Sequence, residues 1–415
     1  MRAMKLALRF AGVMGVAFLI GTPAAAQNTF SKIERGRYLV KAGDCAFCHN
    51  DKEGRPYAGG RAIATPFGLI YSMNITPDRE TGIGTWSEQD FYNAMHHGIG
   101  NEGKHLYPAC PYPWFTKLSR TDVDAIKAFL DILEPVKQEN KPTELPWPLS
   151  WRGAMAVWNK VYFHEGEFKP DPQKSDQWNR GAYLVEGPGH CGACHTAKNP
   201  LGAVKNDKRM EGGAIGEYWY TPSLSSDLRD GVGGWSADEI VEYLKTGSNA
   251  KAAATGPMTD VVVNSTQYLS DADLGAIAIY LKDMPKKKDS DATSAELEAQ
   301  ALARGQALYA DNCTGCHMPD GRGIARVFPS LKGNAALQAE RPDTVIHVVL
   351  TGAKMAATPT KPTGLAMPAF DWKLDDQEIT DVVNYIRHAW GNHAPLVSIG
   401  MVSEGRNEVV ALPHK

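Results

Sequence analysis

Three short segments of this sequence carry the same arrangement of two cysteines and one histidine. In each segment two residues separate the cysteines, and the histidine directly follows the second cysteine. Two thiols at this spacing can form thioether bonds to the two vinyl groups of one porphyrin, and the adjacent histidine can bind the iron as its proximal ligand. The pattern therefore predicts three covalently bound haem c groups. The attachment residues are Cys45 and Cys48, Cys191 and Cys194, and Cys313 and Cys316, and the iron ligands are His49, His195 and His317.

The cysteine count and the net charge exclude a disulfide framework and nucleic-acid binding as explanations of the sequence. Six of the seven cysteines lie in the three motifs, so Cys110 stands alone and no disulfide framework can form. A formal net charge of −3 argues against a general nucleic-acid binder. A chain of 415 residues is long enough for two to four domains, each with its own core.

The N-terminus has the three-part layout of a secretory signal peptide. Basic residues precede an apolar run over 10–20, and three alanines at 24–26 offer a cleavage site before Gln27. The apolar run is too short to span a bilayer. We therefore expect residues 1–26 to be removed and the mature protein to be periplasmic, where covalent haem attachment also takes place.

The chain also contains an internal repeat around the three motifs. A helix-like lead precedes each motif at 35–40, 180–185 and 304–309, and an amphipathic helix closes each unit at 118–130, 269–281 and 374–386. Serines at 87 and 236 can cap helices in the first two units. We predict an all-α fold of three tandem cytochrome c-type domains joined by loop-rich linkers. The domains are 27–138, 176–285 and 299–393, the linkers are 139–175 and 286–298, and the tail is 394–415.

The linker over 139–175 is unusually aromatic. It contains Trp147, Trp151, Trp158 and Phe163. These side chains predict that the segment packs against a domain. The linker over 286–298, with three lysines and many small polar residues, is instead typical of a solvent-exposed connection.

Two methionines occupy equivalent places in the repeat. Met258 and Met367 each lie shortly before a closing helix, on a loop that can fold over the open face of a haem. A lone methionine is most often a core residue. The shared position predicts that these two are the sixth ligands of the second and third irons.

The first unit has Cys110 where the others have methionine. Three alternatives remain open. Cys110 can bind the iron as a thiolate, which would lower the potential of that haem. It can instead be a buried neutral thiol beside an iron whose sixth position is empty or holds water. Another residue, such as Met73, can provide the ligand.

Several further motifs resemble one protein family. In the first unit these are Gly59-Gly60-Arg61, Thr65-Pro66-Phe67-Gly68, Asn74-Ile75-Thr76-Pro77-Asp78 and Gly82-Ile83-Gly84, and in the second they are the stretches 178–185 and 189–196. Together they resemble three-haem cytochrome c subunits of bacterial membrane-associated dehydrogenases that act on alcohols, aldehydes, gluconate, sorbitol or fructose. The resemblance covers nearly the whole mature chain, with Cys110 as a departure because the family has methionine there.

The resemblance implies partners as well as a role. Such subunits carry electrons from a catalytic dehydrogenase subunit, with or without a small subunit, to ubiquinone. The catalytic cofactor in the family is pyrroloquinoline quinone, flavin or molybdopterin. Many members end in a hydrophobic anchor, whereas the stretch 396–402 here is too short to span a bilayer. Contact with the outer face of the cytoplasmic membrane is then expected through a partner or an amphipathic surface.

We therefore predict an electron-transfer subunit without catalytic residues of its own. Two alternatives differ in class. A Cys-ligated first haem would suit an enzyme of the thiosulfate-oxidising type, and a chain without a fixed partner would be a free periplasmic shuttle.

Overall fold

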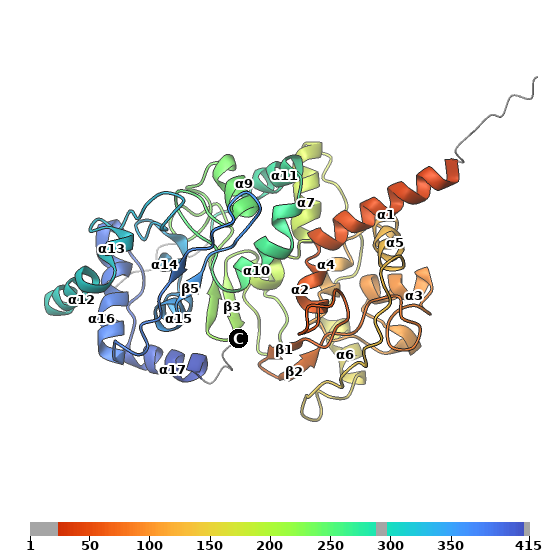
Figure 1. Ribbon diagram of the computed structural model, residues 1–415, viewed down its shortest axis with the longest axis horizontal. Coiled ribbons are helices and arrows are strands. Elements are labelled where there is room, and N and C mark those ends of the chain that lie inside the picture. The colour runs from red at the N-terminus through yellow and green to blue at the C-terminus, as the bar shows by residue number, and fades with distance from the viewer. Residues whose placement is uncertain (1–23, 288–296, 411–415) are drawn as a thin grey trace, which may run out of the picture.

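The computed structural model describes residues 24–287 and 297–410 (Figure 1). The expected signal peptide, residues 1–26, lies almost entirely outside the described residues, and so does most of the linker over 286–298. Three repeats follow one another along the long axis of the molecule. We refer to residues 24–130, 176–282 and 299–388 as repeats 1, 2 and 3. The domain boundaries stay predictions.

Repeat 1 contains the helices α1 (Ala24–Ala42), α2 (Cys45–His49), α3 (Glu88–Tyr92), α4 (Tyr112–Phe115) and α5 (Arg120–Leu130), a π-helical turn η1 (Asn93–His97), a 3-10 turn η2 (Asn101–Gly103) and the strands β1 (Ala62–Thr65) and β2 (Gly68–Tyr71). The connector to repeat 2 holds one helix, α6 (Gly153–Tyr162). This segment therefore has regular structure in its second half.

Repeat 2 contains α7 (Asp176–Glu186), α8 (Gly192–His195), α9 (Ala237–Thr246), α10 (Pro257–Asn264), α11 (Asp271–Lys282), the 3-10 turns η3 (Asn206–Lys208) and η4 (Thr266–Tyr268), and the strands β3 (Gly213–Gly216) and β4 (Trp219–Thr221). Repeat 3 contains α12 (Ala299–Asn312), α13 (Thr314–His317), α14 (Ala335–Gln338), α15 (Asp343–Thr351), α16 (Asp376–His388), and the strands β5 (Ala353–Lys354) and β6 (Ala366–Met367). A 3-10 turn η5 (Ala389–Gly391) and the helix α17 (Ile399–Val410) follow it.

The prediction of an all-α fold is wrong, because each repeat also contains a two-stranded antiparallel sheet. In repeat 1, Ala62 pairs with Tyr71 and Thr65 with Gly68 around a tight turn. In repeat 2 the turn residues Glu217 and Tyr218 both have positive φ angles, as a two-residue hairpin turn requires. The strands are only two to four residues long, too short for their alternating pattern to stand out in the sequence. The class is mixed, with helices predominating.

Each repeat is built on the same crossing of two helices. The opening helix packs on the closing helix in the pairs α1 with α5, α7 with α11, and α12 with α16. A glycine of the opening helix lies at each crossing, and a Cβ atom there would collide with a backbone carbonyl of the closing helix. These residues are Gly36, Gly181 and Gly305. The arginine preceding each glycine pairs with an aspartate of the closing helix, as Arg180 does with Asp273 at 2.8 Å.

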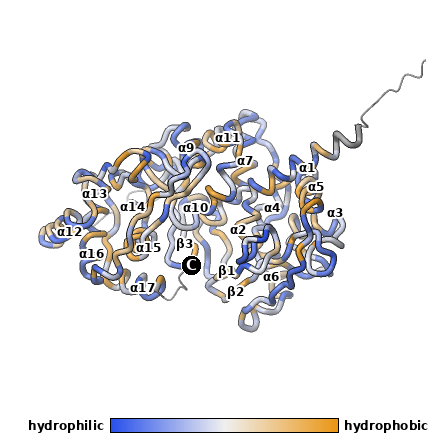
Figure 2. The backbone as a smooth tube through the Cα atoms, in the orientation of Figure 1, coloured by the Kyte–Doolittle hydropathy of each residue, from blue (hydrophilic) through white to orange (hydrophobic). Residues whose placement is uncertain are grey.

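The buried side chains of the described residues form three large clusters, one centred on each repeat, and a small fourth cluster between repeats 2 and 3. Leu39, Leu118 and Val123 are fully buried in repeat 1. Leu274 in repeat 2 and Ile379 in repeat 3 are equivalent to Val123 and are also fully buried. In Figure 2 the hydrophobic stretches alternate with hydrophilic ones along the helices. This is the amphipathic pattern that packs one helix face inward. The predicted serine caps are confirmed, because Ser87 and Ser236 each form a capping box.

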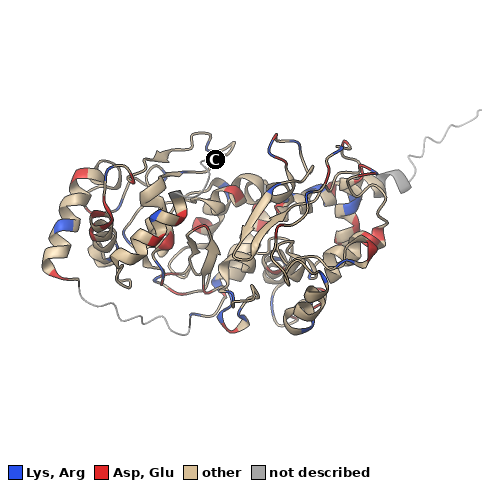
Figure 3. Cartoon of the chain, turned by 90° about the horizontal axis from the view of Figure 1, so that it is seen from below, with Lys and Arg blue, Asp and Glu red and all other residues tan. Residues whose placement is uncertain are grey.

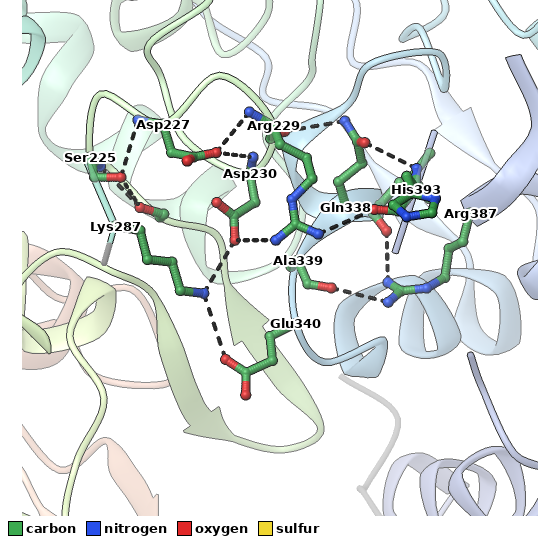
Figure 4. Close-up of polar contacts among 12 residues, drawn as sticks. Ser225, Asp227, Arg229, Asp230, Lys287, Gln338, Ala339, Glu340, Arg387 and His393 are labelled. Atoms are coloured by element: carbon green, nitrogen blue, oxygen red, sulfur yellow. Dashed lines mark hydrogen bonds and ion pairs between the residues drawn. The ribbon is translucent and has the colours of Figure 1, made fainter. Parts of the chain in front are cut away.

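Repeats 2 and 3 meet through a polar cluster (Figure 4). Lys287 lies 3.4 Å from the Asp230 carboxylate and 3.6 Å from that of Glu340. The amide of Gln338 donates to the carbonyl of Arg229 at 3.2 Å. A second contact joins β4 to α15, where the Trp219 and His347 rings stack at 3.9 Å between centroids. Among the described residues, none of the helices has the length and apolar character needed to cross a bilayer.

Candidate haem sites

Each cysteine–histidine motif forms a short helix directly after an opening helix. These helices are α2, α8 and α13, and each ends at the motif histidine. All six motif cysteines are free thiols in the structure. The sharp turn into the first motif is made by Asp44, and the turn into the second by His190, both with positive φ angles. In the second and third motifs the first cysteine is the residue just before the helix, so each motif occupies about one turn of chain.

A backbone carbonyl fixes the tautomer of each motif histidine. The Nδ1 atoms of His49, His195 and His317 lie 2.7, 2.8 and 3.0 Å from the carbonyl oxygens of Met73, Pro222 and Pro329. A ring that donates from Nδ1 keeps the Nε2 lone pair for a metal. Burial lowers the pKa of all three histidines, which favours the neutral form that a metal needs.

The motif thiols are partly buried, except that of Cys316, which is exposed. Burial raises the pKa of Cys45, Cys48 and Cys191 to about 12, and that of Cys313 to about 11. Partly buried surroundings suit the apolar edge of a porphyrin. With anchored imidazoles and uncommitted thiols together, the residues present fit haem c at each motif.

The candidate sixth ligands differ in how closely they approach these motifs. Cys110 lies close enough to the first motif to add to the raised pKa of Cys45 and Cys48, and burial raises its own pKa to about 11. Met258 lies in the first turn of α10 and packs beside Ala254 and Val262. Met367, in β6, packs against the core of repeat 3. The structure therefore brings Cys110 to the first motif, while the ligand roles of Met258 and Met367 stay predictions.

The first two sites also exchange contacts across the boundary between their repeats. Helix α10, which carries Met258, packs on α2, and Trp114 of α4 lies against Gly192 of the second motif. The Ser265 hydroxyl donates to the carbonyl of Ala42 at 3.2 Å. Each of these two repeats thus contacts the motif of the other. Repeat 1 does so with α4, which follows Cys110, and repeat 2 does so with α10, which holds Met258.

Two tyrosines complete this exchange. Tyr38 of α1 donates at 2.5 Å to Asp273 of repeat 2, and Tyr183 of α7 donates to Asp122 of repeat 1. Each aspartate also pairs with an arginine of its own repeat. The equivalent residue in repeat 3 is Ala307, so repeat 3 has no tyrosine for such an exchange.

The carbonyl acceptors were not identified from the sequence, although a signal for two of them exists. Pro222 and Pro329 each begin a Pro-Ser-Leu triplet downstream of a motif. The triplets begin 27 and 12 residues after their motif histidines, and their recurrence downstream of two motifs indicates a shared role.

Comparisons with known proteins agree with this geometry. The family described as Cytochrome c matches residues 302–390, which supports covalently bound haem c. The gluconate 2-dehydrogenase cytochrome c subunit of Pantoea cypripedii is 41% identical, over 91% of this chain and 91% of the relative.

Two further relatives cover similar lengths. The cytochrome c subunit of the quinone-type alcohol dehydrogenase of Gluconobacter oxydans is 41% identical over 92% of this chain and 83% of its own length. The fructose dehydrogenase cytochrome subunit of Gluconobacter japonicus is 37% identical over 93% and 84%. The chain belongs to this family of cytochrome c subunits of dehydrogenase complexes, and as such it is an electron-transfer subunit without catalysis of its own.

Proposed function

We propose that this chain is a three-haem cytochrome that carries electrons from a catalytic dehydrogenase subunit to ubiquinone. Haem c would be attached at Cys45 and Cys48, Cys191 and Cys194, and Cys313 and Cys316. The observation that carries the proposal is the recurrence of one local geometry, in which each motif histidine is anchored through Nδ1 to a carbonyl at 2.7–3.0 Å. When bound, haem supplies an iron that alternates between the ferric and ferrous states.

The protein would tune each site through its axial ligands and burial. His49, His195 and His317 would be the proximal ligands, with Met258 and Met367 opposite the second and third. For the first site we propose Cys110, because its thiol lies close enough to the motif to influence the pKa of Cys45 and Cys48. Met73 is a poor candidate, since its carbonyl holds the Nδ1 atom of His49 and its backbone therefore lies behind the proximal ring.

The exchange between repeats 1 and 2 supports transfer between their sites. Two cofactors held by interlocking segments would keep a short, fixed separation, which electron tunnelling requires. Repeat 3 contacts repeat 2 through the Trp219–His347 stack and the Lys287 cluster. We propose that electrons pass along the repeats in spatial order.

The partners and compartment follow from the family and from the N-terminal sequence. The catalytic subunit would use pyrroloquinoline quinone, flavin or molybdopterin, with or without a small subunit. The N-terminal pattern supports export, so the mature chain would work in the periplasm at the outer face of the cytoplasmic membrane.

Intact-mass analysis of the exported protein tests the haem count. The expected mass exceeds that of the mature polypeptide by three porphyrins bound through thioether bonds. Replacement of Cys45 and Cys48 by alanine removes one of the three. A wild-type mass without this excess would contradict the proposal. Purification in mild detergent, followed by identification of the proteins that co-elute, tests the catalytic partner, and a chain that always elutes alone would contradict it.

A further inference from the structure

The connector between repeats 1 and 2 is exposed near its middle and packs on repeat 1 further along. We predicted that its aromatic residues pack against a domain, but Trp147 and Trp151 are 83% and 64% exposed, so that prediction is wrong for both. Phe163 does pack, because its ring meets the Tyr112 ring edge-on at 5.2 Å between centroids. The residues that follow Phe163 therefore lie against repeat 1.

Hydrogen bonds hold this part of the connector in place. The Gly166 amide donates to the Thr116 hydroxyl at 3.0 Å, and the Gly166 carbonyl accepts a hydrogen bond from Nζ of Lys117 at 2.9 Å. The Phe168 amide donates to the carbonyl of Lys117 at 3.0 Å. These bonds fix the backbone on both sides of Glu165 and Gly166, so the Glu165 carboxylate is held beside the end of η1.

The turn η1 ends in two consecutive histidines. It is a π-helical turn, in which the Gly98 amide donates to the carbonyl of Asn93, and turns of this kind are frequent at functional sites. The turn stops at Gly98, which has a φ of 66° and where a Cβ atom would collide with the Tyr112 ring. The rings of His96 and His97 lie edge to face, with centroids 4.8 Å apart.

Two imidazoles and one carboxylate thereby form a compact cluster. Nδ1 of His97 lies 2.9 Å from one oxygen of Glu165, and Nε2 of His96 lies 3.9 Å from the other. One possible ligand atom from each side chain lies within 4.8 Å of the other two. We call His96, His97 and Glu165 the His–His–Glu cluster.

An ion pair with Glu165 accounts for His97 but leaves His96 unexplained. His96 is 5% exposed, and its ring is stacked on Tyr92 at 4.8 Å between centroids. Its Nδ1 atom is buried and has no hydrogen-bond partner among the described residues, and the 3.9 Å from Nε2 to Glu165 exceeds a hydrogen-bond distance. A buried polar side chain without partners is costly and points to a missing ion or water.

The charge state of His96 suits a metal. Burial and the neighbouring His97 both lower the pKa of His96, so its ring is neutral at physiological pH. A neutral imidazole offers a nitrogen lone pair to a metal ion, whereas a protonated one does not.

The surroundings offer space and a second carboxylate. A cavity of about 450 Å³ lies beside the cluster and is lined by Glu165, Glu167 and Lys117 among others, which leaves room for water ligands. Glu167 adds a second negative charge near His96. Basic and acidic residues are interspersed over the described chain (Figure 3). A cation would therefore be held here by its ligand atoms and not by a broad field of one sign.

Two imidazoles and one carboxylate are a ligand set that Zn²⁺ uses in proteins, with water completing the coordination. Mg²⁺ and Ca²⁺ prefer oxygen ligands alone. We propose that the His–His–Glu cluster binds one Zn²⁺ ion. The ion joins the end of η1 to the connector, and its ligands belong to none of the three cysteine–histidine motifs. The inference does not depend on the number of haems.

Metal analysis of the haem-loaded full chain, purified without a histidine tag, tests the proposal. The protein is treated with EDTA, which leaves haem iron in place, and is dialysed against Zn²⁺ or Mg²⁺ before the bound metal is measured by plasma mass spectrometry. Wild-type protein is expected to bind one Zn²⁺ per chain and no Mg²⁺. His97→Ala and Glu165→Gln should each bind Zn²⁺ about tenfold or more weakly, because each loses one ligand. Neither side chain is buried, so the fold should tolerate both changes.

His164→Ala is the matched control. His164 is exposed, precedes Glu165 directly and lies outside the cluster, so its replacement should leave Zn²⁺ binding unchanged. Glu165→His replaces one ligand type by another and should bind Zn²⁺ within about tenfold of wild type, since three histidines are also a zinc ligand set.

Hydrogen exchange gives a second measurement. Zn²⁺ should slow exchange of the Gly166 and Phe168 amides in wild type, because the ion ties their segment to η1. In His97→Ala the same addition should leave both amides unchanged.

Three results would overturn the proposal. The first is wild-type protein that binds no more Zn²⁺ than His97→Ala does. The second is equal binding of Mg²⁺, which would indicate general attraction to acidic side chains. The third is an equal loss of Zn²⁺ binding in His164→Ala. Haem content, measured by intact mass in the same samples, separates these results from a failure of the proposed function.

Discussion

The pair of tyrosines between repeats 1 and 2 allows a quantitative prediction. Tyr38 donates at 2.5 Å to Asp273, whose side chain is 13% exposed, and Tyr183 donates to Asp122, whose side chain is 2% exposed. A hydrogen bond to a charged group contributes about 1.5–3 kcal/mol. In Tyr38→Phe the carboxylate keeps both bonds from Arg180, so we expect a loss of about 1.5 kcal/mol in the free energy of unfolding. Tyr183→Phe should cost about 2–3 kcal/mol, because Asp122 is more deeply buried.

The measurement combines urea unfolding of the haem-loaded protein with hydrogen exchange. Amides in α2 and α10 should exchange faster in the double variant Tyr38→Phe/Tyr183→Phe, since these helices pack together across the boundary. Tyr309→Phe is the control, because that hydroxyl donates to the neutral carbonyl of Met318 within repeat 3. It should cost about 1 kcal/mol and leave exchange in α2 unchanged. Unchanged stability and unchanged exchange in the double variant would refute the reasoning.

Three further predictions concern the helix crossings, the first site and acid. Gly305→Ala places a methyl group against the carbonyl of Asp381 and should lower the free energy of unfolding, measured by thermal unfolding, by about 1–3 kcal/mol. Gly315→Ala is the control. Gly315 has open space around it inside the third motif, so this variant should keep both its stability and its haem content. Cys110→Ala should convert a low-spin ferric paramagnetic-resonance signal of the first haem to high spin, and Cys110→Met should restore low spin; a low-spin signal that survives in Cys110→Ala would exclude the thiolate. Burial raises the pKa of Asp273, but the hydrogen bonds from Arg180 and Tyr38 outweigh it and hold that pKa below its usual value. The stabilisation is therefore complete above the unfolded pKa of about 3.9 and is lost as the pH falls further, so Asp273→Asn should show a flatter unfolding profile than wild type below about pH 4.

The haem motifs could be read from the sequence because their chemistry is local. Two thiols and an imidazole must lie on one turn of chain, so spacing alone identifies them. The opening and closing helices were also readable, since their apolar periodicity extends over ten or more residues. The hairpins could not be predicted from the sequence, because strands such as Ala353–Lys354 are too short to show the alternating pattern of a β-strand.

What the sequence could not show depends on contacts between distant segments. The carbonyl of Met73 lies 24 residues from His49, and nothing in its side chain indicates that its backbone would anchor a ring. The exposure of Trp147 was missed for a related reason. Aromatic residues are buried more often than not, and only the folded connector shows which of its side chains turn outward.

The three repeats have similar sequences, but one side chain distinguishes repeats 1 and 2 from repeat 3. Tyrosine follows the Arg-Gly pair by two residues in repeats 1 and 2, and alanine stands there in repeat 3. The hydroxyl reaches across a boundary to an aspartate that the neighbouring repeat already holds with its own arginine. Each repeat therefore stabilises the other with a group that its own fold does not need. Repeat 3, which lacks the hydroxyl, is joined to repeat 2 by the buried Lys287–Asp230 pair, by the Trp219–His347 stack and by Tyr218, which packs into the core of repeat 3. The molecule therefore consists of a pair linked by reciprocal tyrosine–aspartate bonds and a third unit linked by other contacts.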